Sequence, residues 1–235
     1  MKVEILYEDS DILVCVKPYG MPVQEDKSRD TDLVSYLKHY IFEKGDVEEE
    51  PYLAMVHRLD RPVGGVMVFA KTEKAAANLS DQIQDGRVVK FYQAVLTGEL
   101  REDSGMMEDY LLKDGKSNTS KVVKKGTKGA KRAELYYEVL DVFETDEGIF
   151  SYVLIELITG RHHQIRVQTA SRGAGVCGDT KYNAASAKKK KGGSQIALYA
   201  TRLEFEHPVT GEHKVFKCEP EGNAFEVIEM EGFGM

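Results

Sequence analysis

Short runs of β-branched and aromatic residues, separated by turn residues, recur along most of the chain. Such runs predict strands, and we expect them at residues 3–7, 12–16, 66–71, 88–96, 117–124, 134–143, 150–157, 196–206 and 212–217. Many consecutive strands joined by short turns favour antiparallel pairing. We therefore predict an α+β fold with a central mixed sheet and helices packed on it.

Helical spacing of apolar residues appears in fewer places. It predicts a helix over residues 32–42 and another over residues 73–85. Thr72 can cap the second helix and Gly86 can end it, and we interpret the apolar stripe of this helix as core rather than as a cofactor site. Two further helices are expected at residues 162–171 and 224–231.

The composition fits a globular protein rather than a secreted or membrane protein. The 235 residues are 42% hydrophobic and 30% charged, which fits one large domain or two small ones. The N-terminus has no signal-peptide pattern, and no apolar stretch approaches the roughly 20 residues that span a bilayer. The three cysteines are widely spaced without a C-x-x-C pair, which favours a reduced, cytoplasmic setting.

The charge is acidic overall but unevenly distributed. A formal net charge of −7 argues against a protein that coats nucleic acid nonspecifically. Residues 113–132 are nevertheless rich in lysine, including Lys121, Lys124 and Lys125, and Lys188-Lys189-Lys190-Lys191 follows later. Basic loops on an acidic body suit selective RNA docking, although a solvated lysine loop that keeps the protein soluble is the alternative interpretation. Acidic residues gather at Glu48-Glu49-Glu50 and towards the C-terminus.

The segment His57-Arg58-Leu59-Asp60-Arg61 carries the first candidate for chemistry. Asp60 lies between two arginines on a turn that leads into an apolar strand. Neighbouring arginines favour an ionised carboxylate, which is the form that can act as a nucleophile. The alternative is an ordinary turn aspartate in a surface ion pair with Arg58 or Arg61.

The segment from Ile155 to Gln168 carries the second candidate. It is expected to form a strand, a Thr-Gly turn and the start of a helix that bears Arg161 and Arg166. Cationic side chains at a helix N-terminus favour anion binding. His57, His162 and His163 do not have the spacing of a metal site, so we expect no metal.

Together these segments resemble the RluA-like family of RNA pseudouridine synthases, whose patterns are HRLDxxTSGxxxxAK and TGRxHQIRVH. Further motifs match in the same order: Lys17-Pro18-Tyr19-Gly20-Met21-Pro22-Val23, Lys90-Phe91-Tyr92, Gly178-Asp179-Thr180-Lys181-Tyr182 and Leu198-Tyr199-Ala200. The resemblance implies a bipartite, mainly antiparallel sheet with an active cleft across its middle. It also implies one catalytic domain over residues 1–235, because the motif at Lys17 leaves no room for the N-terminal S4 domain of some relatives.

The resemblance also implies roles for single residues. Asp60 would be the catalytic aspartate, Tyr92 would stack on the target base, and Arg166 would keep the Asp60 carboxylate ionised. Arg58 would enter the RNA stack when the uridine flips out, and Arg61 and Arg161 would contact the RNA. Leu198 is a candidate for an apolar wall of the uracil pocket, although a core leucine is the simpler interpretation, just as Tyr92 can be a buried strand tyrosine.

The chemistry of the implied reaction fits these residue types. Isomerisation breaks the N1–C1′ bond of uridine and rejoins the uracil through C5, so it needs no redox or metal cofactor. Asp60 could form a glycosyl ester or remove the C2′ proton, and the sequence leaves both routes open. The target base must leave the RNA stack, which explains a stacking tyrosine and an inserted arginine.

Some positions depart from the family pattern. Pro62-Val63-Gly64-Gly65 replaces the xTSG turn, so the hydroxyl groups of Thr and Ser are missing, and His162, Gln168 and Tyr199 replace the usual Thr, His and His. None of these changes removes a proposed catalytic group, but they affect the details of RNA contact. The alternative hypothesis is a catalytically silent RNA-binding or ribosome-assembly module on the same fold, and a non-RNA hydrolase that uses Asp60 is a more distant one. The joint presence of Asp60, Tyr92 and Arg166 favours the enzyme. The substrate would be rRNA or tRNA, and we expect a monomer.

Overall fold

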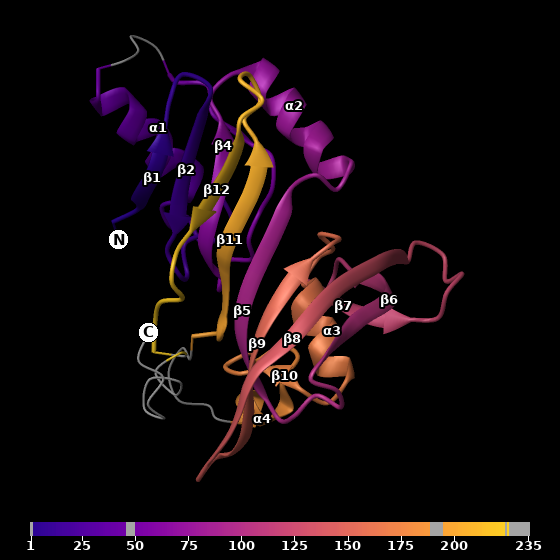
Figure 1. The fold of residues 1–235 in the computed structure, drawn as a ribbon. Coiled ribbons are helices and arrows are strands. Elements are labelled where there is room, and N and C mark those ends of the chain that lie inside the picture. The colour runs from indigo at the N-terminus through magenta and orange to yellow at the C-terminus, as the bar shows by residue number, and fades with distance from the viewer. Residues whose placement is uncertain (1, 46–49, 189–194, 224, 226–235) are drawn as a thin grey trace. The chain divides into compact units, whose positions relative to one another are not determined.

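The structure is a computed structural model that describes residues 2–45, 50–188, 195–223 and 225. The chain divides into two compact units (Figure 1). Unit 1 comprises Met1–Val89 and Ala200–Glu219, and unit 2 comprises Lys90–Tyr199 and Pro220–Met235. We describe each unit by itself.

Unit 1 is built on a sheet with two fully buried central strands. The strands follow the order β1 (Glu4–Glu8), β2 (Ile12–Lys17), β4 (Gly64–Ala70) and β11 (Leu198–Glu206, of which Leu198 and Tyr199 fall in unit 2), with β3 (Ala54–Met55) on β4 and β12 (His213–Lys217) on β11. β2 and β4 pair antiparallel over their whole length, from Ile12 opposite Ala70 to Lys17 opposite Gly65. Every residue of these two strands is buried, which explains their continuous apolar sequence.

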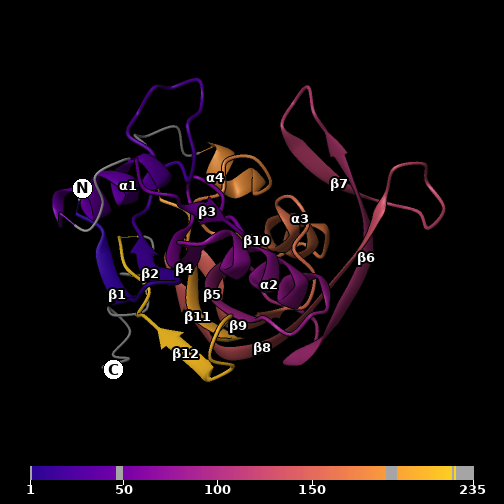
Figure 2. The same cartoon turned by 90° about the horizontal axis from the view of Figure 1, so that it is seen from above.

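Two helices complete unit 1, and both were predicted. α1 spans Leu33–Glu43 and is capped by Asp32, and α2 spans Glu73–Gln84 and is capped by Thr72, whose hydroxyl accepts from the Ala75 amide at 3.2 Å. A side-chain cap satisfies one of the free amides at a helix N-terminus. α2 packs Leu79 and its neighbours against β2, β4 and β11 (Figures 1 and 2), so the apolar stripe of this helix is core, as predicted.

Unit 2 contains the second set of strands. β5 (Val89–Thr97, of which only Val89 falls in unit 1), β9 (Gly148–Leu157), β8 (Lys131–Thr145), β6 (Ser104–Asp114) and β7 (Thr119–Val123) are neighbours in this order, and β10 (Gly175–Val176) pairs with β5. All of these pairs are antiparallel. α3 (Gln164–Ser171) packs against β6, β7 and β10, and α4 (Ala184–Lys188) follows. The predicted α+β class is thereby confirmed.

The lysine-rich segment agrees with the prediction only in part. The strand expected at residues 117–124 is confirmed as β7, but the basic loops expected over residues 113–132 are shorter, because the end of β6 and the start of β8 also lie in this range (Figure 2). β6 was not predicted at all, because only Met107 and Leu111 of this strand are buried, and two apolar positions four residues apart give no alternating signal. α4 was not predicted either.

Some predicted features lie outside the described residues. These are the helix at residues 224–231, of which only Phe225 is described, together with Glu48, Glu49 and Lys189 to Lys191. In the part of the chain that the structure describes, no helix has the length and apolar character needed to cross a membrane.

Candidate active site

Asp60 lies on a tight turn directly before β4, as predicted. The Val63 amide donates to the Asp60 carbonyl at 2.9 Å, which closes the turn. The Arg61 carbonyl accepts from the Gly20 amide at 3.1 Å, so the turn is also tied to the segment that follows β2. Asp60 is half-buried. Because its turn joins directly onto the buried strand pair of unit 1, that pair fixes its position.

Lys17 supports the Asp60 turn from the buried side, a role that was not predicted from the sequence. Its side chain is fully buried, and Nζ donates to the carbonyls of Met21, Pro18 and Arg61 at 2.7, 3.0 and 3.1 Å. Burial lowers the pKa of Lys17 to about 7, while the negative charge of the nearby Asp60 raises it. A lysine that ends an otherwise apolar strand is the signal that could have identified it.

Gly65 makes the close packing of this turn possible. Its φ is +123°, and a Cβ atom at this position would lie 2.2 Å from the Ala200 carbonyl oxygen. Only glycine fits such a backbone conformation and approach. The Gly of the xTSG pattern is therefore retained for a steric reason, although Val63 and Gly64 replace the two hydroxyl residues.

The two arginines beside Asp60 have different surroundings. Arg61 pairs with Asp26 at 3.2 Å and with Asp30, and it donates to the Gly20 carbonyl at 3.0 Å. Arg58 is exposed, and among the described residues it has no ion-pair partner. Arg61 thus holds the 26–30 segment in place, whereas Arg58 is available for a ligand.

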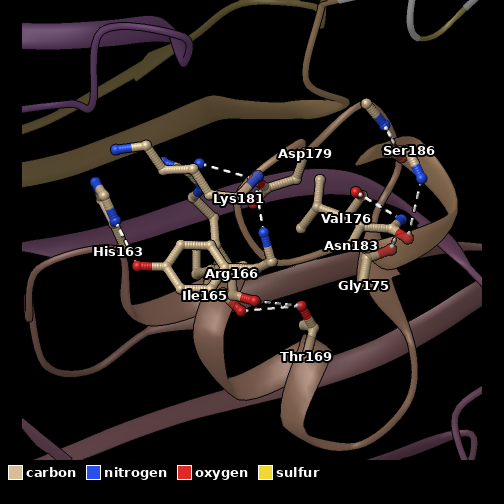
Figure 3. A network of polar contacts seen from close by, with 12 residues as sticks. His163, Ile165, Arg166, Thr169, Gly175, Val176, Asp179, Lys181, Asn183 and Ser186 are labelled. Carbon is tan, nitrogen blue, oxygen red and sulfur yellow. Dashed lines mark hydrogen bonds and ion pairs between the residues drawn. The ribbon is translucent and has the colours of Figure 1, made fainter. Parts of the chain in front are cut away.

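Arg166 of α3 is the central polar residue of unit 2. Its side chain is 5% exposed and forms a bidentate ion pair with the fully buried Asp179, with Nε–Oδ2 and Nη2–Oδ1 distances of 2.7 and 2.8 Å (Figure 3). The guanidinium carbon lies 5.2 Å from the centre of the Tyr182 ring. Asp179 and Tyr182 were recognised in the sequence only as part of a matching motif, and their contacts with Arg166 were not predicted.

The same network fixes the start of α3. The Tyr182 hydroxyl lies 2.7 Å from His163 Nδ1 and accepts from the Ser120 amide at 2.7 Å. His162 Nδ1 lies 2.9 Å from Ser120 Oγ, and the two histidine rings stack with centroids 3.7 Å apart. Among the described residues, no group of three His, Cys, Asp or Glu side chains is arranged to hold a metal ion.

The other predicted site residues of unit 2 fall into two groups. Tyr92 on β5 is 7% exposed and Leu198 at the start of β11 is 4% exposed, so both are largely covered. Arg161 and the three lysines of the β7 region, Lys121, Lys124 and Lys125, are exposed. Arg161 Nε donates to the Arg132 carbonyl at 2.8 Å, which holds the guanidinium beside the start of β8.

Unit 1 thus holds a half-buried aspartate on a turn, and unit 2 holds a buried arginine and several exposed cations. These group types are typical of the class of enzymes that act on polyanionic substrates. Comparison with known proteins agrees with this class. The family model described as RNA pseudouridylate synthase matches residues 11–171.

Individual relatives match over most of the chain. An uncharacterized RNA pseudouridine synthase of Bacillus subtilis, YlyB, is 33% identical over 230 residues, which cover 97% of this chain and 73% of that protein. Ribosomal large subunit pseudouridine synthase D of Vibrio cholerae is 32% identical over 231 residues, 92% of this chain and 67% of that protein. The solved structure of human RNA pseudouridylate synthase domain containing 1 has a similar fold, with a TM-score of 0.74 at 24% identity over 93% of this chain and 84% of that one.

The chain belongs to the RNA pseudouridylate synthase family. The resemblance found in the sequence is confirmed, and the activity class is that of an isomerase that converts uridine in RNA to pseudouridine. RNA is accordingly the substrate class.

Proposed function

We propose that this enzyme isomerises a specific uridine of rRNA or tRNA, with Asp60 as the catalytic carboxylate. The observation that carries the proposal is the fixed position of Asp60 at the start of β4, where the Val63 amide closes the turn at 2.9 Å and Lys17 supports it from the buried side. A carboxylate held by a rigid scaffold needs little reorganisation when it attacks C1′ or removes the C2′ proton. Both routes begin from the ionised carboxylate.

The partners of Asp60 are proposed from the family motifs. Arg166 would keep Asp60 ionised, Tyr92 would stack on the flipped uracil, and Leu198 would form an apolar wall beside it. The bidentate contact with Asp179 supports this role for Arg166, because it fixes the plane of the guanidinium. Arg58 would take the place of the flipped base in the RNA, and its exposed side chain without an ion-pair partner among the described residues suits that role.

The RNA backbone would be contacted by Lys121, Lys124 and Lys125, which are exposed. Arg61 and Arg161 were also predicted to contact RNA; we keep Arg161 and assign Arg61 to holding the 26–30 segment, since its guanidinium already binds Asp26 and Asp30. The Vibrio cholerae relative is named for the large ribosomal subunit, so large-subunit rRNA is the first substrate to test. We further propose that both units act together as one catalytic domain in the cytoplasm.

The test is the release of tritium from RNA labelled at C5 of uridine, measured with large-subunit rRNA and tRNA pools that lack their native modifications. We expect release from one pool with the wild type and none with Asp60→Ala, while both proteins bind the RNA with similar affinity. Asp81→Ala is the matched control, because Asp81 is exposed on α2 and outside the proposed site. Equal release from the wild type and Asp60→Ala would refute the role of Asp60, and RNA binding without any release would support a silent binding module.

A further inference from the structure

Unit 2 contains a cavity that the proposed catalytic groups do not use. It has a volume of about 190 Å³ and lies among the ends of β6 and β8, the strand β7 and the turn that precedes α3. Its wall includes Lys113, Lys131, Arg161 and His162, and no carboxylate of the described part of the chain lines it. We call this cavity the basic pocket.

Strand register explains why these side chains meet. Leu111 of β6 lies opposite Lys131 of β8, and Lys113 of β6 lies opposite Ser120 of β7. Residues two apart on a strand point to the same face, so Leu111 and Lys113 share one face with their cross-strand partners. Leu111 is 4% exposed and packs with the core. The pocket therefore has an apolar base and cationic sides.

The cations of the pocket are not neutralised by any residue that the structure describes. Among the described residues, neither lysine of the pocket nor Arg161 has a carboxylate partner. Arg132, one residue beyond Lys131, shows the opposite arrangement, because it pairs with Glu108 at 2.8 Å and Glu134 at 2.7 Å. Three like charges around one cavity repel each other unless an anion binds between them. The cluster of cations is unusual in a chain with a net charge of −7.

The polar side of the pocket is held in place. His162 Nδ1 lies 2.9 Å from Ser120 Oγ and Nε2 lies 3.1 Å from Asn118 Oδ1, so the ring is fixed between β7 and the start of α3. Arg161 is oriented by its hydrogen bond to the Arg132 carbonyl, which leaves its terminal nitrogens to form a fork. Such a fork matches the oxygens of a phosphate group.

We propose that the basic pocket holds a backbone phosphate of the RNA substrate, through Lys113, Lys131 and Arg161. This inference rests on the proposed function for the nature of the anion. RNA suits the site better than a free anion, because the exposed Lys124 and Lys125 follow β7 and precede Lys131 in the chain, and further phosphates of a polyanion can pair with them. The pocket would anchor the strand while the base is read elsewhere.

The test is the double variant Lys113→Gln/Lys131→Gln. Both side chains are exposed, so the fold should be retained. The matched control is Lys27→Gln/Lys74→Gln, which removes the same charge from exposed positions in unit 1. The dissociation constant of a transcribed large-subunit rRNA fragment is measured for each protein over a series of KCl concentrations, without any need for turnover.

We expect the pocket variant to bind at least about fivefold more weakly than the control, with a log–log salt slope less negative by about 0.7 to 0.9, the value for one phosphate. In the tritium assay, KM should rise while kcat changes little. Equal affinities and slopes for the two double variants would overturn the proposal, even if the wild type modifies RNA. Weaker binding by the pocket variant would support it even if no RNA were modified, which separates its failure from that of the proposed function.

A second arm identifies the source of the phosphate. Thermal unfolding of the wild type and the pocket variant is compared in inorganic phosphate and in chloride at equal ionic strength. Stabilisation by inorganic phosphate that the pocket variant loses, combined with unchanged RNA affinity, would show a site for a free anion and would overturn the RNA assignment.

Discussion

The buried ion pair between Arg166 and Asp179 offers a direct test of how unit 2 is held together. Both side chains are almost completely covered, at 5% and 0% exposure, and two hydrogen bonds of 2.7 and 2.8 Å join them. Removing one partner of a buried pair deprives the other charge of that bidentate contact, which costs about 3–5 kcal/mol. We therefore expect Asp179→Asn to lower the free energy of unfolding by that amount.

Asparagine isolates the effect of the charge. Asp179 Oδ1 also accepts from the amides of Lys181 at 2.9 Å and Tyr182 at 3.3 Å, and the amide oxygen of asparagine can keep both bonds. Its NH₂ group, however, cannot accept from Arg166. The matched control is Asp114→Asn, because Asp114 accepts from the Lys116 amide at 2.9 Å in an exposed turn of the same unit, and it should change stability little.

The assay is urea unfolding, followed by circular dichroism and by tyrosine fluorescence, since the chain has 12 tyrosines and no tryptophan. With a denaturant slope of about 1–3 kcal/mol/M, the expected loss moves the midpoint by about 1 M or more. The double variant Arg166→Met/Asp179→Leu should be more stable than Asp179→Asn, because it removes both charges. A stability within about 1 kcal/mol of the wild type for Asp179→Asn would refute the reasoning.

Two further predictions concern the Asp60 turn. Gly65→Ala should destabilise the protein by more than about 4 kcal/mol, because its Cβ would lie 2.2 Å from the Ala200 carbonyl oxygen. The control is Gly86→Ala, which should cost only about 1–2 kcal/mol, because Gly86 has a φ of +72° but open space around it. Equal losses of stability in urea unfolding would contradict the steric argument. The second prediction concerns Lys17, whose pKa is lowered from 10.5 to about 7 in the folded protein. Between these two pH values the unfolded chain keeps the proton on the Lys17 amine and the folded protein does not, so the free energy of unfolding should rise with pH by up to about 1.4 kcal/mol per pH unit. Lys17→Met should lack this contribution, so parallel stability profiles of Lys17→Met and the wild type from pH 7 to 10 would show that the side chain does not titrate there.

Local patterns in the sequence were sufficient for both helices of unit 1, for its strands other than the two-residue β3, and for the Asp60 turn. Continuous apolar runs identified β2 and β4, and Thr72 marked the start of α2. These signals come from residues that are close together in the chain, namely the spacing of apolar residues and the capping residues of helices. The family motifs identified the activity class for the same reason, because their residues keep fixed spacings along the chain.

Only the tertiary structure decided which distant residues meet. In the folded chain Asp179 pairs with Arg166, and the buried Lys17 supports the Asp60 turn. Three strands and a turn line the basic pocket. Strand register and long-range packing bring these groups together, and neither leaves a period in the sequence. β6 was missed for a related reason: its stability comes from pairing with β7 and β8, whereas only Met107 and Leu111 of its own residues reach the core.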